Sequence, residues 1–162
     1  MDLDQQIQVL IENAPQDGST PGIMKAIAPG LKEFALKLRH LNYYVFRTLD
    51  EAWVLTTLGN RLEPTMEKKV IYAFPTPKDA SSFQQMPDPQ VIAFSVPVTH
   101  ILFQMFAMDM VDSTVFIETP GNLTTGTEIF RDNLADCIHA YMQKYLLETR
   151  GQSGINIPSN FA

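Results

Sequence analysis

Cysteine, basic residues and long apolar runs are all scarce in this chain of 162 residues. Cys137 is the only cysteine, so a disulfide framework is excluded. The N-terminus begins Met-Asp-Leu-Asp and lacks a positively charged export signal, which makes the cytoplasm the expected compartment. No apolar run reaches the roughly 18 residues that a membrane-spanning helix needs. We therefore predict a cytoplasmic protein that does not associate with a membrane.

The charge balance is acidic, with 12 Lys and Arg against 18 Asp and Glu, and gives a formal charge of −6. A protein that binds nucleic acid usually carries a basic face that neutralises phosphates. The local basic excess around Lys32, Lys37 and Arg39 fits an exposed helix face. We therefore predict no nucleic-acid partner.

Motifs for catalysis and for metal binding are missing from the sequence. His40, His100 and His139 are far apart and do not have the close spacing of a zinc site. No nucleophile elbow, zinc-protease motif or dinucleotide fingerprint is present. Cys137 falls in the middle of a helical pattern, without a helix N-terminus or an adjacent cation to activate its thiol, so a small buried residue is expected. We assign no catalytic residue, no metal and no cofactor, and favour a protein that is not an enzyme.

The N-terminal part of the sequence predicts two helices followed by a hairpin. Apolar residues at helical spacing predict helices over 2–13 and 23–41, with a loop between them, and Pro29-Gly30 should break or kink the first turns of the second helix. Aromatic and β-branched residues fill 43–48 and 52–58, which are separated by a short polar break. This pattern predicts an antiparallel hairpin.

From Lys69 to Arg150 the patterns of strands and helices alternate. Three strands are predicted, over 69–74, 90–96 and 113–118. Three helices are predicted, over 77–85 with Thr76 as its N-cap, 97–110 and 132–148. Such alternation favours parallel neighbours joined by crossover helices.

The predicted fold is thus a single α/β domain of the mixed α+β type over residues 1–150. It has a mixed sheet of about five strands, crossover helices and two N-terminal helices. Residues 151–162 show no periodicity, so we expect them to form a mobile C-terminal tail.

Three short signatures between Tyr43 and Ile138 carry a resemblance to a known family. Phe74-Pro-Thr-Pro77 precedes Asp79-Ala-Ser-Ser-Phe83, Val96-Pro97 precedes an apolar helix, and Thr119-Pro-Gly121 precedes Gly126-Thr-Glu128. These features resemble the N-terminal domain of the SseB family, named for enhanced serine sensitivity, from which Pro75 and Thr119 depart. The chain also resembles small cyanobacterial proteins without an assigned activity. The resemblance implies an α/β domain, and it implies no reaction and no catalytic residues.

The loop after the third of these strands is the best candidate for a ligand site. Open α/β sheets bind ligands where a strand ends and a helix follows, and hydroxyls and free backbone donors there could hold an anion or a small polar group. The candidate residues are Thr119, Gly121, Asn122, Thr124, Thr125, Gly126 and Thr127. It is not a Walker A loop, because Thr127-Glu128 follows Gly126. The alternative is a turn in which Gly and Thr serve only backbone geometry.

The predicted helix over 97–110 is apolar on most of its circumference, which fits either the core or a surface for a partner. The candidate interface residues are Phe103, Met105, Phe106, Met108 and Met110. Our leading hypothesis is a non-enzymatic cytoplasmic module for protein interaction or regulation, which predicts a homodimer or a protein partner. The competing hypothesis is a binder of a small polar or anionic ligand, potentially an enzyme, that uses the 119–127 loop.

Overall fold

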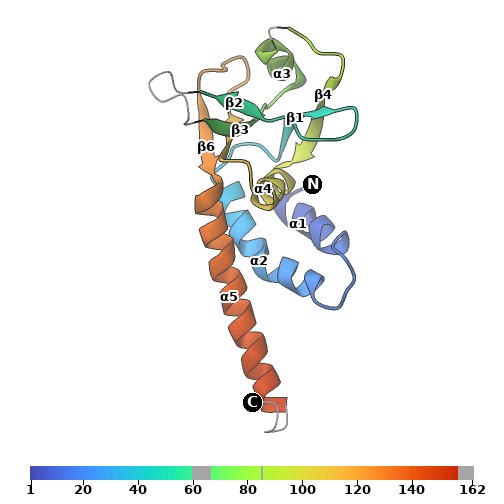
Figure 1. The fold of residues 1–162 in the computed structure, drawn as a ribbon, viewed down its shortest axis with the longest axis vertical. Coiled ribbons are helices and arrows are strands. Elements are labelled where there is room, and N and C mark those ends of the chain that lie inside the picture. The colour runs from blue at the N-terminus through green and yellow to red at the C-terminus, as the bar shows by residue number, and fades with distance from the viewer. Residues whose placement is uncertain (60–66, 85, 157–162) are drawn as a thin grey trace.

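The computed structural model describes residues 1–59, 67–84 and 86–156 of the chain. These residues form five helices and six strands, arranged as one mixed α+β domain (Figure 1). The predicted fold class is therefore confirmed. None of the described helices combines the length and the apolar character needed to cross a membrane.

The two N-terminal helices are α1 (Leu3–Glu12) and α2 (Thr20–Ala35). α1 starts with a capping box, in which Asp2 accepts a hydrogen bond from the backbone N–H of Gln5 and Gln5 accepts one from that of Asp2. α2 begins before the predicted residue 23, because the carboxylate of Asp17 binds the backbone N–H groups of Ser19 and Thr20 and fixes the turn there. Pro29 lies inside α2, which continues through it, so the helix is not broken there, and a kink at Pro29 stays a prediction.

One sheet has four strands in the order β2, β3, β5, β6. β3 and β5 are parallel, while β2 pairs with β3 and β6 with β5 in antiparallel fashion. The strands are β2 (Thr56–Leu58), β3 (Lys68–Ala73), β5 (Ser113–Ile117) and β6 (Gly126–Phe130). The sheet is thus mixed, as predicted, with the parallel pair at its centre.

The second sheet consists of β1 (Asn42–Thr48) and β4 (Val91–Pro97), which are antiparallel. Tyr44 and Phe74 join the two sheets, because each donates its backbone N–H to the carbonyl of the other, at 2.7 and 2.9 Å. The predicted hairpin of 43–48 with 52–58 is wrong: β1 pairs with β4, and β2 pairs with β3. What remains of the hairpin is the single bridge between Arg47 and Trp53. The partner strand of β1, β4, lies far along the sequence, so local pattern could not reveal it.

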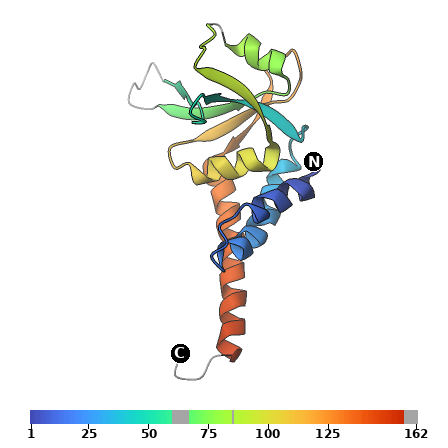
Figure 2. The ribbon, with the colours of Figure 1, turned by 90° about the vertical axis from the view of Figure 1, so that its right-hand side faces the viewer.

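Two helices connect the strands between β3 and β5. α3 (Pro77–Phe83) has Thr76 as its N-cap, whose hydroxyl accepts from the backbone N–H of Asp79 at 3.1 Å, as predicted. α4 (Val98–Ala107) follows directly after β4 and lies under the sheet (Figure 2).

The last helix, α5 (Arg131–Asn156), has 26 residues. It leaves the sheet and extends well beyond the rest of the domain, with α2 packed along its first half (Figures 1 and 2). Residues 151–156, which we expected to belong to the tail, are helical. The remainder of the predicted tail, 157–162, lies outside the described residues.

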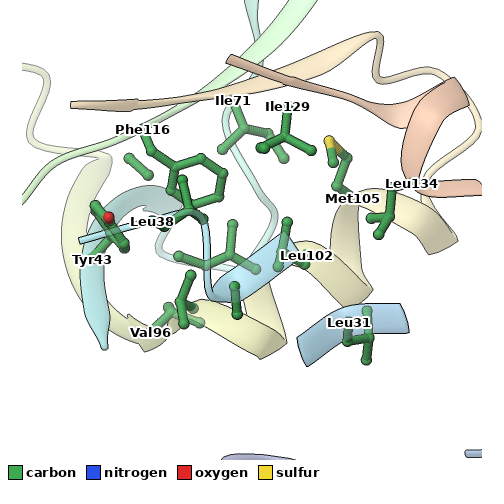
Figure 3. Close-up of a cluster of buried hydrophobic side chains, with 14 of the residues drawn as sticks. Leu31, Leu38, Tyr43, Ile71, Val96, Leu102, Met105, Phe116, Ile129 and Leu134 are labelled. Carbon is green, nitrogen blue, oxygen red and sulfur yellow. The ribbon is translucent and has the colours of Figure 1, made fainter. Parts of the chain in front are cut away.

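The main core lies between the sheet and the helices α2, α4 and α5 (Figure 3). Tyr43, Phe116, Leu102, Met105 and Leu134 are fully buried there. A smaller cluster around Phe74, Ala80 and Ile117 fills the other face of the sheet, under α3. The two clusters place α4 and α3 on opposite faces.

Candidate functional site

The predicted loop 119–127 connects two antiparallel strands instead of a strand and a helix. Gly126 and Thr127 belong to β6, opposite Ile117 and Phe116. A Cβ on Gly126 would lie 2.6 Å from the carbonyl oxygen of Phe116, so glycine is needed there for strand pairing. The sequence analysis missed β6, because its five residues run directly into α5 without a turn signal.

The polar groups of this loop largely bind one another. Gly121, at a φ of +83°, donates its N–H to Oδ1 of Asp79 at 2.8 Å. The backbone N–H and the hydroxyl of Thr124 both donate to Oδ1 of Asn122, at 3.1 and 2.6 Å. The carbonyl of Thr119 accepts from the N–H of Asn122, and Thr125 is exposed.

Beside this loop is an open pocket of about 590 Å³ against α3. Of the seven predicted binding residues, Gly121 lines it, together with Pro120 and Leu123 of the loop and Thr76, Lys78, Asp79 and Ser82 near α3. Because Asp79 already occupies the backbone donor of Gly121, no free donor of this glycine faces the pocket. A role of the loop in ligand binding stays a prediction.

The five predicted interface residues differ in their exposure. Met105 is fully buried and accepts a hydrogen bond from the hydroxyl of Thr114 through its sulfur. Phe103, Phe106 and Met108 are half-buried against the main core, and Met110 is 62% exposed. Met105 therefore cannot contact a partner, and an interface at the others stays a prediction.

A different pocket lies where α1, α2 and α4 meet the β1–β4 sheet, and its volume is about 410 Å³. Its walls come from three stretches of the chain, within residues 10–24, 47–53 and 96–104. The lining residues belong to the end of α1 (Leu10, Asn13, Ala14, Pro15), the start of α2 (Thr20, Met24), the sheet (Arg47, Val96), Trp53, and α4 (His100, Phe103, Gln104). We call this site the Arg47 pocket.

Arg47 gives the pocket its chemical character. Its guanidinium lies over the rings of both Trp53 and Phe94, with Cζ at 5.3 and 5.0 Å from the two ring centroids. Aromatic faces attract a cation at these distances and hold its plane in place. Nε of Arg47 is buried and has no hydrogen-bond partner, and none of the described carboxylates forms an ion pair with this residue. A cation of this kind is held in a fixed position while part of its donor capacity is unused.

His100 contributes a second titratable group to the pocket wall. Its Nε2 lies 3.0 Å from the backbone carbonyl of Gln6. A carbonyl can only accept, so Nε2 carries the proton of this hydrogen bond. Nδ1 is therefore the ring nitrogen left for a ligand, as an acceptor when the ring is neutral and as a donor when it is charged.

A buried carboxylate marks another polar centre, at the end of β5. Glu118 accepts hydrogen bonds from the hydroxyl of Tyr43 and, at 2.9 Å, from the backbone N–H of Arg39. Its own carbonyl pairs with the ring of His40 at 2.7 Å. Burial, and then the hydrogen bond to Glu118, raise the pKa of Tyr43 above its usual range. Because these groups bind one another, the cluster ties β1, the end of β5 and the segment that follows α2 together.

The Arg47 pocket was not predicted from the sequence. Arg47 sits in the strand pattern Tyr-Tyr-Val-Phe-Arg-Thr, and Trp53 is the only tryptophan. The signal available in the sequence for this pocket was Arg47 itself, a single cation in an apolar strand that lies close to the only tryptophan. The other walls come from α1 and α4, whose positions depend on tertiary packing.

A scan against protein-family models finds no match for this chain, and no curated protein is similar to it in sequence. The assignment to the SseB family thus stays a prediction that depends on the three signatures.

Proposed function

We propose that this protein is a binding module that holds a small carboxylate with an apolar body in the Arg47 pocket. The observation that carries the proposal is the guanidinium of Arg47, which lies over the rings of Trp53 and Phe94 and forms no ion pair with a described carboxylate. A ligand carboxylate would accept hydrogen bonds from the terminal Nη groups of Arg47, for which no partner occurs among the described residues, while the buried Nε faces the protein interior.

The planar fork of a guanidinium matches a carboxylate, which can accept two parallel hydrogen bonds. A phosphate carries more charge and is usually surrounded by several cations. Arg47 and His100 are the cationic or titratable residues of the pocket lining, and no lysine lies there. The charge of the site therefore favours a monocarboxylate.

The apolar part of the lining selects the rest of the ligand. Leu10, Met24, Trp53 and Phe103 offer apolar contacts, and Asn13 and Gln104 offer polar ones. Small-molecule sites commonly combine a mainly apolar wall with a few polar groups that fix orientation. We expect an aliphatic or aromatic acid, with its carboxylate at Arg47.

This function is consistent with our hypothesis of a non-enzymatic, cytoplasmic regulatory module, and it places the ligand in the Arg47 pocket instead of the 119–127 loop. The resemblance to the SseB family would add an α/β domain without a known reaction and leaves the nature of the ligand open.

A thermal-unfolding screen tests the proposal. The probes are phenylacetate, indole-3-acetate and hexanoate, each paired with its uncharged amide. We expect the acids to raise the melting temperature in a saturable manner, because a ligand that binds the folded state stabilises it by mass action. The amides should give a much smaller shift.

Two variants show whether the shift arises at this site. Arg47→Lys keeps the charge but removes the fork, so it should lose most of the shift. Arg39→Lys makes the same change at an exposed position and should respond like the unmodified protein. Equal shifts with acids and amides, or a response that survives in Arg47→Lys, would refute the proposed function.

A further inference from the structure

The outer edge of β4 offers backbone hydrogen-bonding groups that the proposed ligand site does not use, although Phe94 and Val96 of the same strand contribute side chains to that site. Among the described residues, β4 pairs with β1 and with no other strand. Figure 2 shows β4 at the front of the sheet, crossing it on the way to α4. The edge strand of a sheet presents unpaired backbone groups that can pair with another chain.

The register with β1 tells which groups point outward. Two hydrogen bonds, Val98 N–H to Leu41 O at 2.8 Å and Leu49 N–H to Gln90 O at 3.1 Å, continue the β1–β4 register at both ends. Hydrogen-bonded pairs alternate with non-bonded ones in an antiparallel ladder. The backbone groups of residues 92, 94 and 96 therefore point toward β1, and those of 91, 93 and 95 point outward.

The other edge of β1 supports this assignment. If the odd-numbered residues of β1 form the backbone hydrogen bonds to β4, the backbone groups of the even-numbered residues of β1 must point to the opposite side of that strand. Tyr44 does so with Phe74, and the carbonyl of Phe46 accepts from the N–H of Val54 at 3.0 Å.

Ala93 and Ser95 then each present a free N–H and a free carbonyl at the outer edge of β4. Val91 presents its carbonyl alone, because its N–H is bound to the carbonyl of Asp88 at 3.0 Å. Pro97 has no N–H and ends the row. The two residues with both a donor and an acceptor lie on either side of Phe94.

The side chains of β4 do not protect this edge. Soluble proteins usually protect exposed edges with charged residues, bulges or covering elements. The sequence of β4, Val-Ile-Ala-Phe-Ser-Val-Pro, has no charge, and Ile92 is 42% exposed. By contrast β6, an edge strand of the four-stranded sheet, carries Glu128, which pairs with Lys68.

We infer that β4 pairs with β4 of a second copy of this chain, antiparallel and centred on Phe94. In this register Ala93 lies opposite Ser95 of the second copy, and each of the two residues donates its N–H to the carbonyl of the other. The twofold axis repeats the same pair of hydrogen bonds on the other side of Phe94. Phe94 faces its own counterpart, and Ile92 lies opposite Val96. No like charges meet across the strands, although the chain carries a net charge of −6. The symmetric placement of the free groups favours a second copy over an unrelated strand.

Sedimentation velocity over a range of protein concentrations gives the first test. We expect a monomer–dimer equilibrium that Ser95→Pro shifts toward the monomer, because proline removes an outward N–H and leaves the bonds to β1 intact. Ser95→Val keeps that N–H and should dimerise like the unmodified protein. Circular dichroism and a cooperative melt show that each variant is folded.

Cross-linking tests the register without a proline. In a Cys137→Ser background, Phe94→Cys places two thiols on a non-bonded pair with Cα atoms about 4.5 Å apart, within the range that a disulfide spans. Ser95→Cys faces Ala93 of the second copy, so its thiols are not opposite. We expect mild oxidation to convert the Phe94→Cys protein to a covalent dimer much faster than the Ser95→Cys protein. A monomer at all concentrations, a dimer that Ser95→Pro leaves unchanged, or equal cross-linking rates would overturn the inference.

Discussion

Gln6 of α1 caps the N-terminus of α4 through Thr99. Its side-chain oxygen accepts hydrogen bonds from the backbone N–H of Thr99 at 3.1 Å and from the hydroxyl at 2.9 Å. Its amide nitrogen donates to the carbonyl of Leu41 at 2.8 Å. α4 has no side-chain cap of its own, because Pro97 precedes it. One fully buried glutamine thus joins α1, α4 and the start of β1 next to the Arg47 pocket.

We expect Gln6→Leu to lower the free energy of unfolding by about 2–4 kcal/mol, because it leaves the buried N–H and the hydroxyl of Thr99 without partners, whereas the carbonyl of Leu41 keeps the N–H of Val98. Gln8→Leu is the matched control, since Gln8 is exposed and bonds Glu12 within α1; its effect should stay within about 0.5 kcal/mol. Urea unfolding of both proteins measures the difference. Similar losses in the two variants would show that the cap is not important for stability.

The sequence predicted most of the fold, because local signals determine most of its elements. Thr76 before Pro77 marked the start of α3, and apolar periodicity found α1 and α4. The hairpin was wrong because aromatic and β-branched residues predict strands without naming their partners. The partner of β1 is β4, which follows it only after β2, β3 and α3.

The Arg47 pocket was harder to predict than the 119–127 loop, because its residues come together only through tertiary packing. The glycine and threonine residues of the 119–127 loop stand together in the sequence, whereas the Arg47 pocket is assembled from α1, α2, β1, β4 and α4. Gln6 has no feature in the sequence that distinguishes it from Gln5 or Gln8. Its role depends on a contact with Thr99, which lies in the second half of the domain.

Removal of the hydroxyl of Tyr43 should destabilise the buried cluster around Glu118. In Tyr43→Phe the carboxylate keeps the N–H of Arg39 but loses the hydroxyl, so we expect a loss of about 1–3 kcal/mol. Tyr44→Phe is the control, because no hydrogen bond of the Tyr44 hydroxyl occurs among the described residues; chemical denaturation should show little change. Equal stability of Tyr43→Phe and the unmodified protein would contradict this account.

The same tyrosine predicts how stability depends on alkaline pH. The pKa of Tyr43 is raised in the folded protein by burial and by Glu118, while in the unfolded chain it has the ordinary value of about 10.0. Above that pH the unfolded chain loses the proton first, so stability is complete below pH 10 and falls as the pH rises further. The slope from this group should approach about 1.4 kcal/mol per pH unit. Denaturation at several alkaline pH values should show a shallower decline in Tyr43→Phe, and parallel curves would argue against it.

Asp79 should hold the 119–123 turn against α3. Its buried carboxylate accepts from the N–H of Gly121 at 2.8 Å and from the hydroxyl of Thr76 at 2.6 Å. We expect Asp79→Ala to cost about 1–3 kcal/mol and to speed hydrogen exchange at the amide of Gly121. Asp88→Ala, at an exposed turn where the carboxylate binds Gln90 N–H, should leave that exchange rate unchanged. Unaltered exchange in Asp79→Ala would mean that the turn keeps its shape without this contact.

Cys137 should react slowly with alkylating reagents, although it is half-buried and not fully enclosed. Burial, together with the nearby carboxylate of Glu33 at 3.2 Å from Sγ, raises the pKa of the thiol from 9.0 to about 11. The thiolate is the reactive form, so its fraction at neutral pH falls about 100-fold. We expect the rate with iodoacetamide at pH 8 to lie far below that of a free cysteine. Glu33→Gln should increase this rate, while Glu12→Gln, which makes the same change away from the thiol, should not. A rate in the unmodified protein equal to that of a free cysteine would show that neither burial nor Glu33 suppresses the thiolate.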